Sequence, residues 1–468
     1  MIKLQHLINI LVFIGIFLIP FNSWNGLDFL GEFSRESSAI FLLLAFFLFV
    51  VNTLLTKKIN VPFKNPIFLL LIIVHLWFLC SVMLNIGNIV TYEFKGISGI
   101  NRFIRQFGAL IFSSFFFTLT YYNTFSKYSV WRIFTIIRKI FFLSFTIVTI
   151  YTFLEIAYVK FNIVFLENVI NLFDYFPFVD VYLDTNNSRI SSITFEPPAL
   201  SSYLLTISAW MFSYILTSKS YLKYIPAFLV VIFAYFSDSR SAILIISIQF
   251  LVFLYFLAVS KKYKINFVKI FSILIFGIVI VSSFKGKVLA EYLYEKVTSL
   301  TIDSDNTHNI SNRSRLGIQY TLGLVFLENP ISGVGLGQQA YESIHLYPSW
   351  ATKNNYEFEL KYLNEDVDDF PPGYNLYMRL LAETGIIGFV LFTSLLLFIF
   401  LVSLSIIKND SSLHRIVAVV IFISMIGFVI NWVQIDTFRV FGFWIVLSLL
   451  LCVTKNKKFI FSEKILNH

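Results

Sequence analysis

Long apolar runs constrain the fold of this chain more than any other feature. A helix needs about 20 mostly apolar residues to cross a bilayer, and twelve runs come close to that length. None of them alternates apolar and polar residues as the strands of a membrane barrel do. We therefore predict an all-α polytopic membrane protein with about twelve transmembrane helices. The predicted spans are residues 5–22, 38–56, 66–84, 107–122, 133–157, 198–217, 221–236, 241–259, 267–284, 385–406, 414–433 and 437–454.

The composition supports a membrane protein and excludes other classes. Only 13% of the 468 residues are charged, against roughly 25% in soluble domains. The formal net charge is +9, but the basic residues lie in short loops between apolar runs, so no basic domain exists to hold nucleic acid. The two cysteines, Cys80 and Cys452, lie inside apolar runs. This excludes a disulfide framework and a thiolate metal site.

Charge alternates between successive connections. The even-numbered connections carry basic residues such as Lys57, Arg132 and Lys261, whereas the odd-numbered ones carry acids such as Glu32 and Glu167. Because cytoplasmic loops are enriched in Lys and Arg, we expect both termini in the cytoplasm. The first apolar run is interpreted as a retained helix, since no small-residue cleavage site follows it.

Two connections on the predicted outer side are long. They cover residues 158–197 and 285–384. We therefore divide the chain into membrane helices 1–9 (residues 1–284), an extracytoplasmic loop (285–384), and membrane helices 10–12 with a basic cytoplasmic tail (385–468).

The large loop is expected to contain helices. Residues 313–328 are predicted to form an amphipathic helix that stops at Asn329-Pro330, and residues 375–383 a short helix before the next span. The predicted apolar face of the first helix consists of Leu316, Tyr320, Leu324, Phe326 and Leu327.

Arg189, Glu196 and Arg240 are candidates for chemistry at the outer mouth of the bundle. Arg189 and Glu196 precede Pro197-Pro198, which can begin a helix. Arg240 lies 17 residues after Lys223, or about 25 Å of helix, so we expect it slightly below the outer surface, where a charge suggests function. The alternatives are a loop ion pair for the first two residues and a snorkelling Arg240 paired with Asp238.

The loop offers further candidates. Arg313 and Arg315 begin the amphipathic helix, and because residues at i and i+2 do not share a face, we expect one of them to point inward; the alternative is a solvated pair. The turn GVGLG at residues 333–337 is neither a P-loop nor a dinucleotide turn and predicts close backbone approach. The acidic residues at 365–369 could bind a divalent ion, but a solvated surface is favoured. We expect no metal and no cofactor.

Four motifs resemble those of the O-antigen ligase and Wzy-type O-antigen polymerase superfamily. They are RISSITFEPPALSSYL (189–204), SDSRSA (237–242), NPISGVGLG (329–337) and YNLYMRLLAETGIIG (374–388). Their order, and a large outer loop before the last spans, agree with that superfamily.

This resemblance implies a membrane-embedded glycosyltransferase with a GT-C-like bundle. The donor would be a glycan on undecaprenyl pyrophosphate, and an acceptor hydroxyl would attack its anomeric carbon. The implied pyrophosphate-binding residues are Arg189, Arg240, Arg313 and Arg315, and the implied glycan-binding residues are Tyr374, Asn375 and Tyr377.

One difference from the ligases of this superfamily decides between the polymerase and the ligase prediction. Ligases of this superfamily typically have His-Asn at the fourth motif, whereas this chain has Tyr374-Asn375. The difference favours a polymerase of O-antigen or a similar surface polysaccharide, with Glu196 and Arg240 as catalytic candidates. The alternatives are an O-antigen ligase that transfers glycan to lipid A-core, a flippase or transporter of lipid-linked oligosaccharide, and a structural membrane subunit.

The resemblance also implies a location and partners. We expect a multi-pass protein of the bacterial inner membrane whose active face is periplasmic. Its partners would be undecaprenyl-pyrophosphate-linked oligosaccharides and a possible chain-length regulator in the same membrane, with no nucleic acid.

Overall fold

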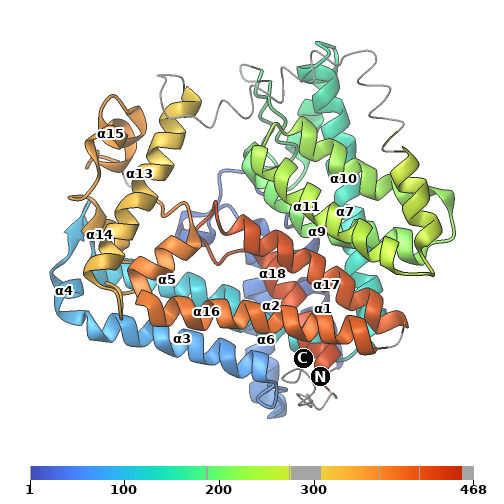
Figure 1. The fold of residues 1–468 in the computed structure, drawn as a ribbon, viewed down its shortest axis with the longest axis horizontal. Coiled ribbons are helices and arrows are strands. Elements are labelled where there is room, and N and C mark those ends of the chain that lie inside the picture. Colours follow the sequence, from blue (N-terminus) through green and yellow to red (C-terminus); the bar gives the residue numbers. More distant parts are fainter. Residues whose placement is uncertain are drawn as a thin grey trace.

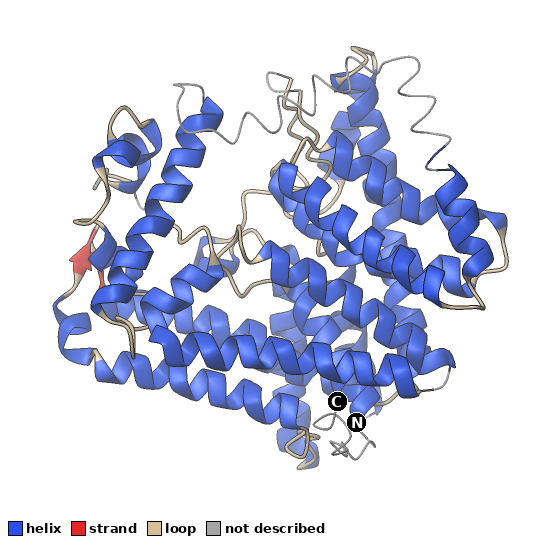
Figure 2. Ribbon diagram, viewed as in Figure 1, coloured by secondary structure: helices blue, strands red, loops and turns tan. Residues whose placement is uncertain are grey.

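The computed structural model describes residues 2–185, 188–273, 275, 307–367, 369–410 and 412–455. Within these residues the fold is almost wholly helical, with one small two-stranded hairpin (Figure 2). The helices of the membrane bundle are α1 (Ile2–Phe17), α2 (Ser37–Thr56), α3 (Pro66–Leu84), α5 (Gly99–Ile111), α6 (Phe117–Phe125), α7 (Val130–Val159), α9 (Pro197–Thr217), α10 (Ile225–Phe236), α11 (Arg240–Val259), α16 (Leu376–Asn409), α17 (Ser412–Asn431) and α18 (Phe441–Thr454).

Shorter elements and one long helix form the connections. A π-helical turn, Phe112–Phe116, joins α5 to α6. The strands pair antiparallel, with Glu93 opposite Ser98. These elements are α4 (Ile86–Thr91), β1 (Glu93–Phe94), β2 (Ile97–Ser98), α8 (Leu166–Ile170), α13 (Thr307–Glu328), α14 (Gln339–Ser343), α15 (Ser349–Thr352) and the π-helix η5 (Phe358–Tyr362).

The helices fit the predicted membrane class. Eight helices in the described part of the chain are long and apolar enough to cross a membrane. Three shorter apolar helices, Leu4–Phe17, Tyr221–Phe236 and Phe441–Thr454, coincide with further predicted spans. Most of the predicted span 267–284 lies outside the described residues. The all-α polytopic class is confirmed, and the count of twelve stays a prediction.

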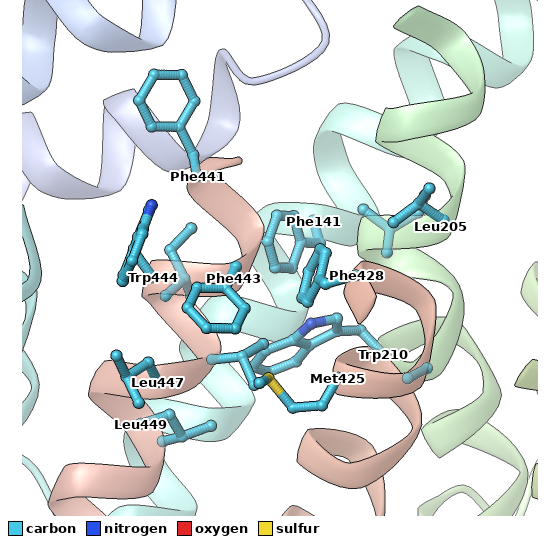
Figure 3. Packing of buried hydrophobic residues seen from close by; sticks show 14 of the residues in the cluster. Phe141, Leu205, Trp210, Met425, Phe428, Phe441, Phe443, Trp444, Leu447 and Leu449 are labelled. Atoms are coloured by element: carbon cyan, nitrogen blue, oxygen red, sulfur yellow. The ribbon is translucent and has the colours of Figure 1, made fainter. Parts of the chain in front are cut away.

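Aromatic side chains fill the centre of the bundle. Phe134 of α7 stacks on Trp210 of α9 with ring centroids 5.3 Å apart, and Trp432 packs on Phe443 at 4.8 Å. Figure 3 shows part of the same cluster, with Trp210, Phe428 and Phe443 packed between α7, α9, α17 and α18. Such pairs contribute about 0.5–1.5 kcal/mol beyond their area, so the many phenylalanines of the sequence serve helix packing as well as lipid contact.

The elements fall into two groups above a common base (Figure 1). Helices α13, α14 and α15 lie with α4 on the left of the view, and α7, α9, α10 and α11 lie on the right. Helix α16 runs along α3 and also contacts α13 and α17, while α17 contacts α9 and α11. Helix α16 therefore joins the large loop to the rest of the bundle.

Two details of the helices differ from the sequence predictions. The span predicted at 107–122 belongs to a longer helix, Gly99–Phe125, because the Ser98 side chain caps its polar first turn. The predicted apolar face of α13 is wrong. Its buried apolar side chains are Ile318, Leu322 and Val325, whereas Leu316, Tyr320 and Leu327 are exposed.

Helix α16 is kinked at Gly385, which separates the predicted short helix from the predicted span. Gly385 has φ 65° and ψ −171°, a conformation open essentially only to glycine. The kink frees backbone carbonyls on its N-terminal side. Val334 N–H donates to Ala382 at 3.0 Å and Gly335 N–H to Glu383 at 2.8 Å. The glycine turn at 333–337 therefore packs on the kink and explains the predicted close backbone approach.

Replacing Gly385 with alanine is expected to destabilise the protein by at least about 1–3 kcal/mol. The new Cβ would lie 2.1 Å from the Ile331 carbonyl oxygen, in addition to the strain of the positive φ. The matched control is Gly108→Ala within α5, where a Cβ meets no atom within 4 Å and helix propensity improves. Thermal denaturation of both purified variants measures the difference, and equal midpoints would contradict this explanation of the kink.

Candidate functional site

Arg315 of α13 is the centre of a group of charged and aromatic side chains. Its guanidinium lies over the Tyr374 ring, 5.1 Å from the centroid. Its charge also acts on Glu196, on Arg240 and on Tyr362. Residues from α13, from the start of α9 and from the start of α11 therefore lie close enough for their charges to interact.

Glu196 is the carboxylate of this group. It occupies the N-cap position of α9, but in the described structure its side chain does not cap the helix, so the carboxylate remains available. Four cations act on it, namely Arg189, Arg315, Arg35 and Lys361. Although Glu196 has an exposed surface, the surrounding protein removes part of its hydration. This raises the pKa of the Glu196 carboxyl above its ordinary value, and the four cations only partly offset the rise.

Arg240 is the first residue of α11 and is half-buried. Ser239 caps the helix by accepting a hydrogen bond from Ala242 N–H at 3.4 Å. A cation at the positive end of a helix dipole is unfavourable, and the charges of Arg315 and Arg189 add further repulsion, against which Asp238 acts as counter-charge. Such a concentration of arginines suits an anionic ligand better than an internal ion pair.

Tyr374 and Tyr362 form a hydrogen-bonded pair beside Arg315. Burial raises the pKa of both hydroxyls, so both stay neutral at physiological pH. Tyr374 is thus a neutral hydrogen-bonding group and part of an aromatic wall next to the arginines.

The loop that carries Arg189 and Glu196 is hydrogen-bonded to Glu155, a buried acid of α7 that the sequence analysis did not select. The Glu155 carboxylate of α7 accepts hydrogen bonds from Ser191 N–H at 3.0 Å and from Ser192 N–H at 2.8 Å.

Three residues near the site have a strained backbone conformation. Ser192 has a φ of 56°, and Asp238 and Tyr374 also adopt positive φ, at 54° and 55°. Strained non-glycine residues cluster at functional sites, and these three lie in the segments that carry the group around Arg315.

Arg313 points elsewhere, as expected for a neighbour two positions from Arg315. Its guanidinium donates to the Asn354 carbonyl at 3.2 Å. It therefore helps to hold the 349–362 segment rather than joining the group around Arg315.

Asn375 and Tyr377 have structural contacts. The Asn375 side chain caps α16 by accepting from Tyr377 N–H at 3.0 Å and from Met378 N–H at 3.3 Å. The Tyr377 hydroxyl donates to the Val429 carbonyl at 2.8 Å. The structure thus groups five of the predicted site residues, namely Arg189, Glu196, Arg240, Arg315 and Tyr374. The side-chain polar groups of Arg313, Asn375 and Tyr377 instead form hydrogen bonds to backbone groups of the protein.

A second polar network lies at the start of α16. Arg379 pairs with Glu383 at 3.1 Å and with Asp436 at 3.7 Å, and it donates to Gln106 at 3.0 Å. Gln106 in turn donates to Glu32 at 2.9 Å. Of these residues, Glu32, Gln106 and Arg379 line a small pocket together with Arg439. The sequence analysis placed polar groups on the first turns of this helix but did not identify the ion pairs.

No group of three His, Cys, Asp or Glu side chains suited to a metal ion occurs among the residues that the structure describes. The acidic residues of the loop, Glu365, Asp366 and Asp369, are exposed; Asp368 lies outside the described residues. The residues grouped around Arg315 offer guanidinium groups, carboxylates and tyrosine hydroxyls.

Residues 225–393 match the model of a protein family described as O-antigen ligase. This region includes Arg240, Arg315 and Tyr374 of the site and the kinked start of α16. No curated protein matches the chain.

Proposed function

We propose, on the premise that the chain belongs to the O-antigen ligase and Wzy superfamily through residues 225–393, that it polymerises lipid-linked oligosaccharides. The substrate would be a repeat unit carried on undecaprenyl pyrophosphate. The enzyme would transfer the growing glycan from one lipid to the sugar of a new lipid-linked unit. We further propose that the reaction takes place on the periplasmic face of a bacterial inner membrane, with both termini cytoplasmic and without a cofactor.

The observation that carries the proposal is the convergence of Arg189, Arg240 and Arg315 around Glu196. A glycosyl pyrophosphate carries two negative charges, and guanidinium groups bind such oxygens through paired hydrogen bonds at any physiological pH. The same charges stabilise the pyrophosphate further as it leaves, because negative charge on the departing oxygen increases in the transition state.

The proposed reaction balances with the groups at this site. The acceptor hydroxyl oxygen forms a bond to the anomeric carbon while the bond from that carbon to the pyrophosphate oxygen breaks. The leaving pyrophosphate keeps the electron pair and is held by the arginines. The hydroxyl proton passes to the Glu196 carboxylate, whose raised pKa suits a general base that must hold a proton transiently.

We expect the rate of polymer formation to rise with pH through the pKa of Glu196 and then to level off. Only the deprotonated carboxylate can accept the proton, so activity falls as pH drops below that pKa. In Glu196→Gln this dependence should disappear and the rate should fall about 10²–10⁴-fold. The elongation rate in isolated membranes at several pH values measures both effects. A Gln variant that keeps the wild-type rate would remove Glu196 from the reaction.

An O-antigen ligase is the second candidate, because the matching family carries that description. A ligase would use the same arginines for the donor but would transfer the glycan to lipid A-core. Tyr374, found where the related ligases have histidine, favours the polymerase, since a neutral phenol is a poor replacement for an imidazole base.

Deletion of the gene distinguishes the two candidates. A polymerase mutant should display lipid A-core that bears a single repeat unit, because ligation continues without polymerisation. A ligase mutant should display bare core while long lipid-linked polymer accumulates. Bare core without such polymer would indicate a flippase instead, and an unchanged ladder on the gel would contradict every one of these activities.

A further inference from the structure

The face of α13 that points away from its own core is apolar. Leu316 is 43%, Tyr320 54% and Leu327 71% exposed. Successive members lie 4 and 7 residues apart, which is close to one and two helical turns, so the three share one face. Each lies two positions, or about 200° around the helix, from one of the buried side chains of α13. Three residues of the sequence-predicted apolar face therefore lie opposite the face that the protein buries.

A helix that is apolar on both faces does not suit water. A surface helix of a soluble domain carries polar residues opposite its buried stripe. A row of exposed apolar side chains instead marks contact with a protein or with a membrane. The exposed face of α13 thus requires an apolar environment outside the loop.

The exposed face continues into the surface of two membrane helices. Ile331, which follows α13, is 65% exposed. The carbonyl of Pro330 accepts a hydrogen bond from Ile386 N–H of α16 at 2.9 Å, and the carbonyl of Ser332 accepts one from the Ser81 hydroxyl of α3 at 2.7 Å. Ile331 therefore lies where the last turns of α3 meet the kink of α16. We refer to Leu316, Tyr320, Leu327 and Ile331 as the apolar stripe.

The neighbouring surface of these two helices must face lipid. Both α3 and α16 are long and apolar enough to cross a membrane. Near the apolar stripe their exposed apolar side chains are Met83, Leu84, Ile386 and Val390. A soluble partner could cover α13 but could not follow this surface into the spans, whereas a bilayer covers both without a break.

The residues beside the apolar stripe are those found at membrane surfaces. The rings of Tyr320 and Trp350 are in contact, with centroids 6.4 Å apart, and both side chains are exposed. Tyrosine and tryptophan are enriched where a membrane meets water. Arg315, next to Leu316, is exposed as well, and a basic residue beside an apolar face favours a surface of anionic lipids.

We propose that the apolar stripe lies in the surface of the bilayer, so that α13 is an interfacial helix rather than a part of the loop that projects into water. This contact holds Arg315 at the level of the lipid phosphates, where a lipid-linked pyrophosphate also lies. The use of Arg315 on that pyrophosphate rests on the proposed function, whereas the contact of α13 with the bilayer does not.

Photo-crosslinking in membranes of the complemented deletion strain tests the proposal. The photoreactive amino acid p-benzoylphenylalanine would replace Tyr320 or Leu327 in the full-length protein. Mass spectrometry of the irradiated protein then identifies what the probe has bonded. Leu84, at the exposed end of α3, is the positive control. Glu365, an exposed acid among other exposed acids of the same loop, is the matched position in water.

We expect phospholipid adducts at positions 84, 320 and 327, at least about tenfold more abundant than at position 365. Phospholipid adducts at position 84 but not at 320 or 327 would overturn the proposal. Crosslinks from 320 and 327 to a second copy of the chain, or to a polyprenyl lipid instead of phospholipid, would also overturn it. Phospholipid adducts in a protein that makes no polymer would leave the contact standing and count against the proposed function alone.

The consequence for Arg315 has a test of its own. Tyr320→Glu/Leu327→Glu places two acids against anionic lipid and should lower polymer synthesis at least about tenfold. Its thermal midpoint in detergent should stay near that of the wild type, because both side chains are exposed. The conservative variant Tyr320→Phe/Leu327→Met keeps the apolar stripe and should keep synthesis. Equal synthesis in the two variants would show that the bilayer contact does not position Arg315.

Discussion

Replacing Arg315 with alanine is expected to lower polymer synthesis at least about a hundredfold, the usual cost of removing one preorganised charge-stabilising group. Arg315 contacts Tyr374 and acts on both Glu196 and Arg240. Its loss would remove the cation that the donor and base regions share. The polysaccharide ladder in a complemented deletion strain, normalised to the amount of protein in the membrane, measures the effect.

Arg313→Ala is the comparison for this prediction. Arg313 lies two residues away on the same helix and carries the same charge, but it binds the Asn354 carbonyl. We expect it to reduce synthesis far less than Arg315→Ala. Equal losses in the two variants would mean that net charge on α13, rather than the position of Arg315, is what matters.

The second large effect is expected on stability. The Glu383 side chain is fully buried and pairs with Arg379, which is 9% exposed. Glu383→Ala leaves a buried guanidinium with Asp436 and the more distant Glu32 as counter-charges. Breaking a buried pair costs about 3–5 kcal/mol, and the remaining acids suggest the lower end of that range. Thermal denaturation in detergent should show a clearly lower midpoint.

Two further variants make this prediction specific. Glu365→Ala removes an exposed acid and should change stability by no more than about 0.5 kcal/mol. Replacing both members of the pair, as in Arg379→Met/Glu383→Leu, should recover much of the loss, because no fully buried charge remains unpaired; Asp436 also loses Arg379 but is partly exposed and still accepts a hydrogen bond from Gly373 N–H at 2.7 Å. A Glu383→Ala protein with the wild-type midpoint would show that the ion pair does not stabilise the start of α16.

The membrane class was predictable because it depends on length and hydrophobicity alone. The face that a loop helix buries was not. Helix α13 carries apolar residues on more than one side, and the sequence analysis chose the face with the larger residues, Leu316 and Tyr320. The structure buries Ile318 instead, because Gly317 allows close contact with Ala351, to which a Cβ on this glycine would come within 2.3 Å.

The candidate site likewise contains residues that could be predicted from the sequence and residues that could not. Arg189 and Arg240 could be selected from the sequence because charges at the ends of apolar helices are rare and costly. Arg35 and Lys361 could not, since each lies in a polar segment where a cation is ordinary. The fold brings both charges near Glu196, which is far from each of them in the sequence.

Reconstitution with natural substrate tests the central claim most directly. Lipid-linked repeat units extracted from the deletion strain would be incubated with the purified protein in lipid vesicles. We predict that the wild type joins them into lipid-linked glycans of several units and releases free undecaprenyl pyrophosphate, and that Arg315→Ala does neither. A wild-type protein that elongates nothing, but transfers the unit once lipid A-core is added, would contradict the polymerase and identify a ligase.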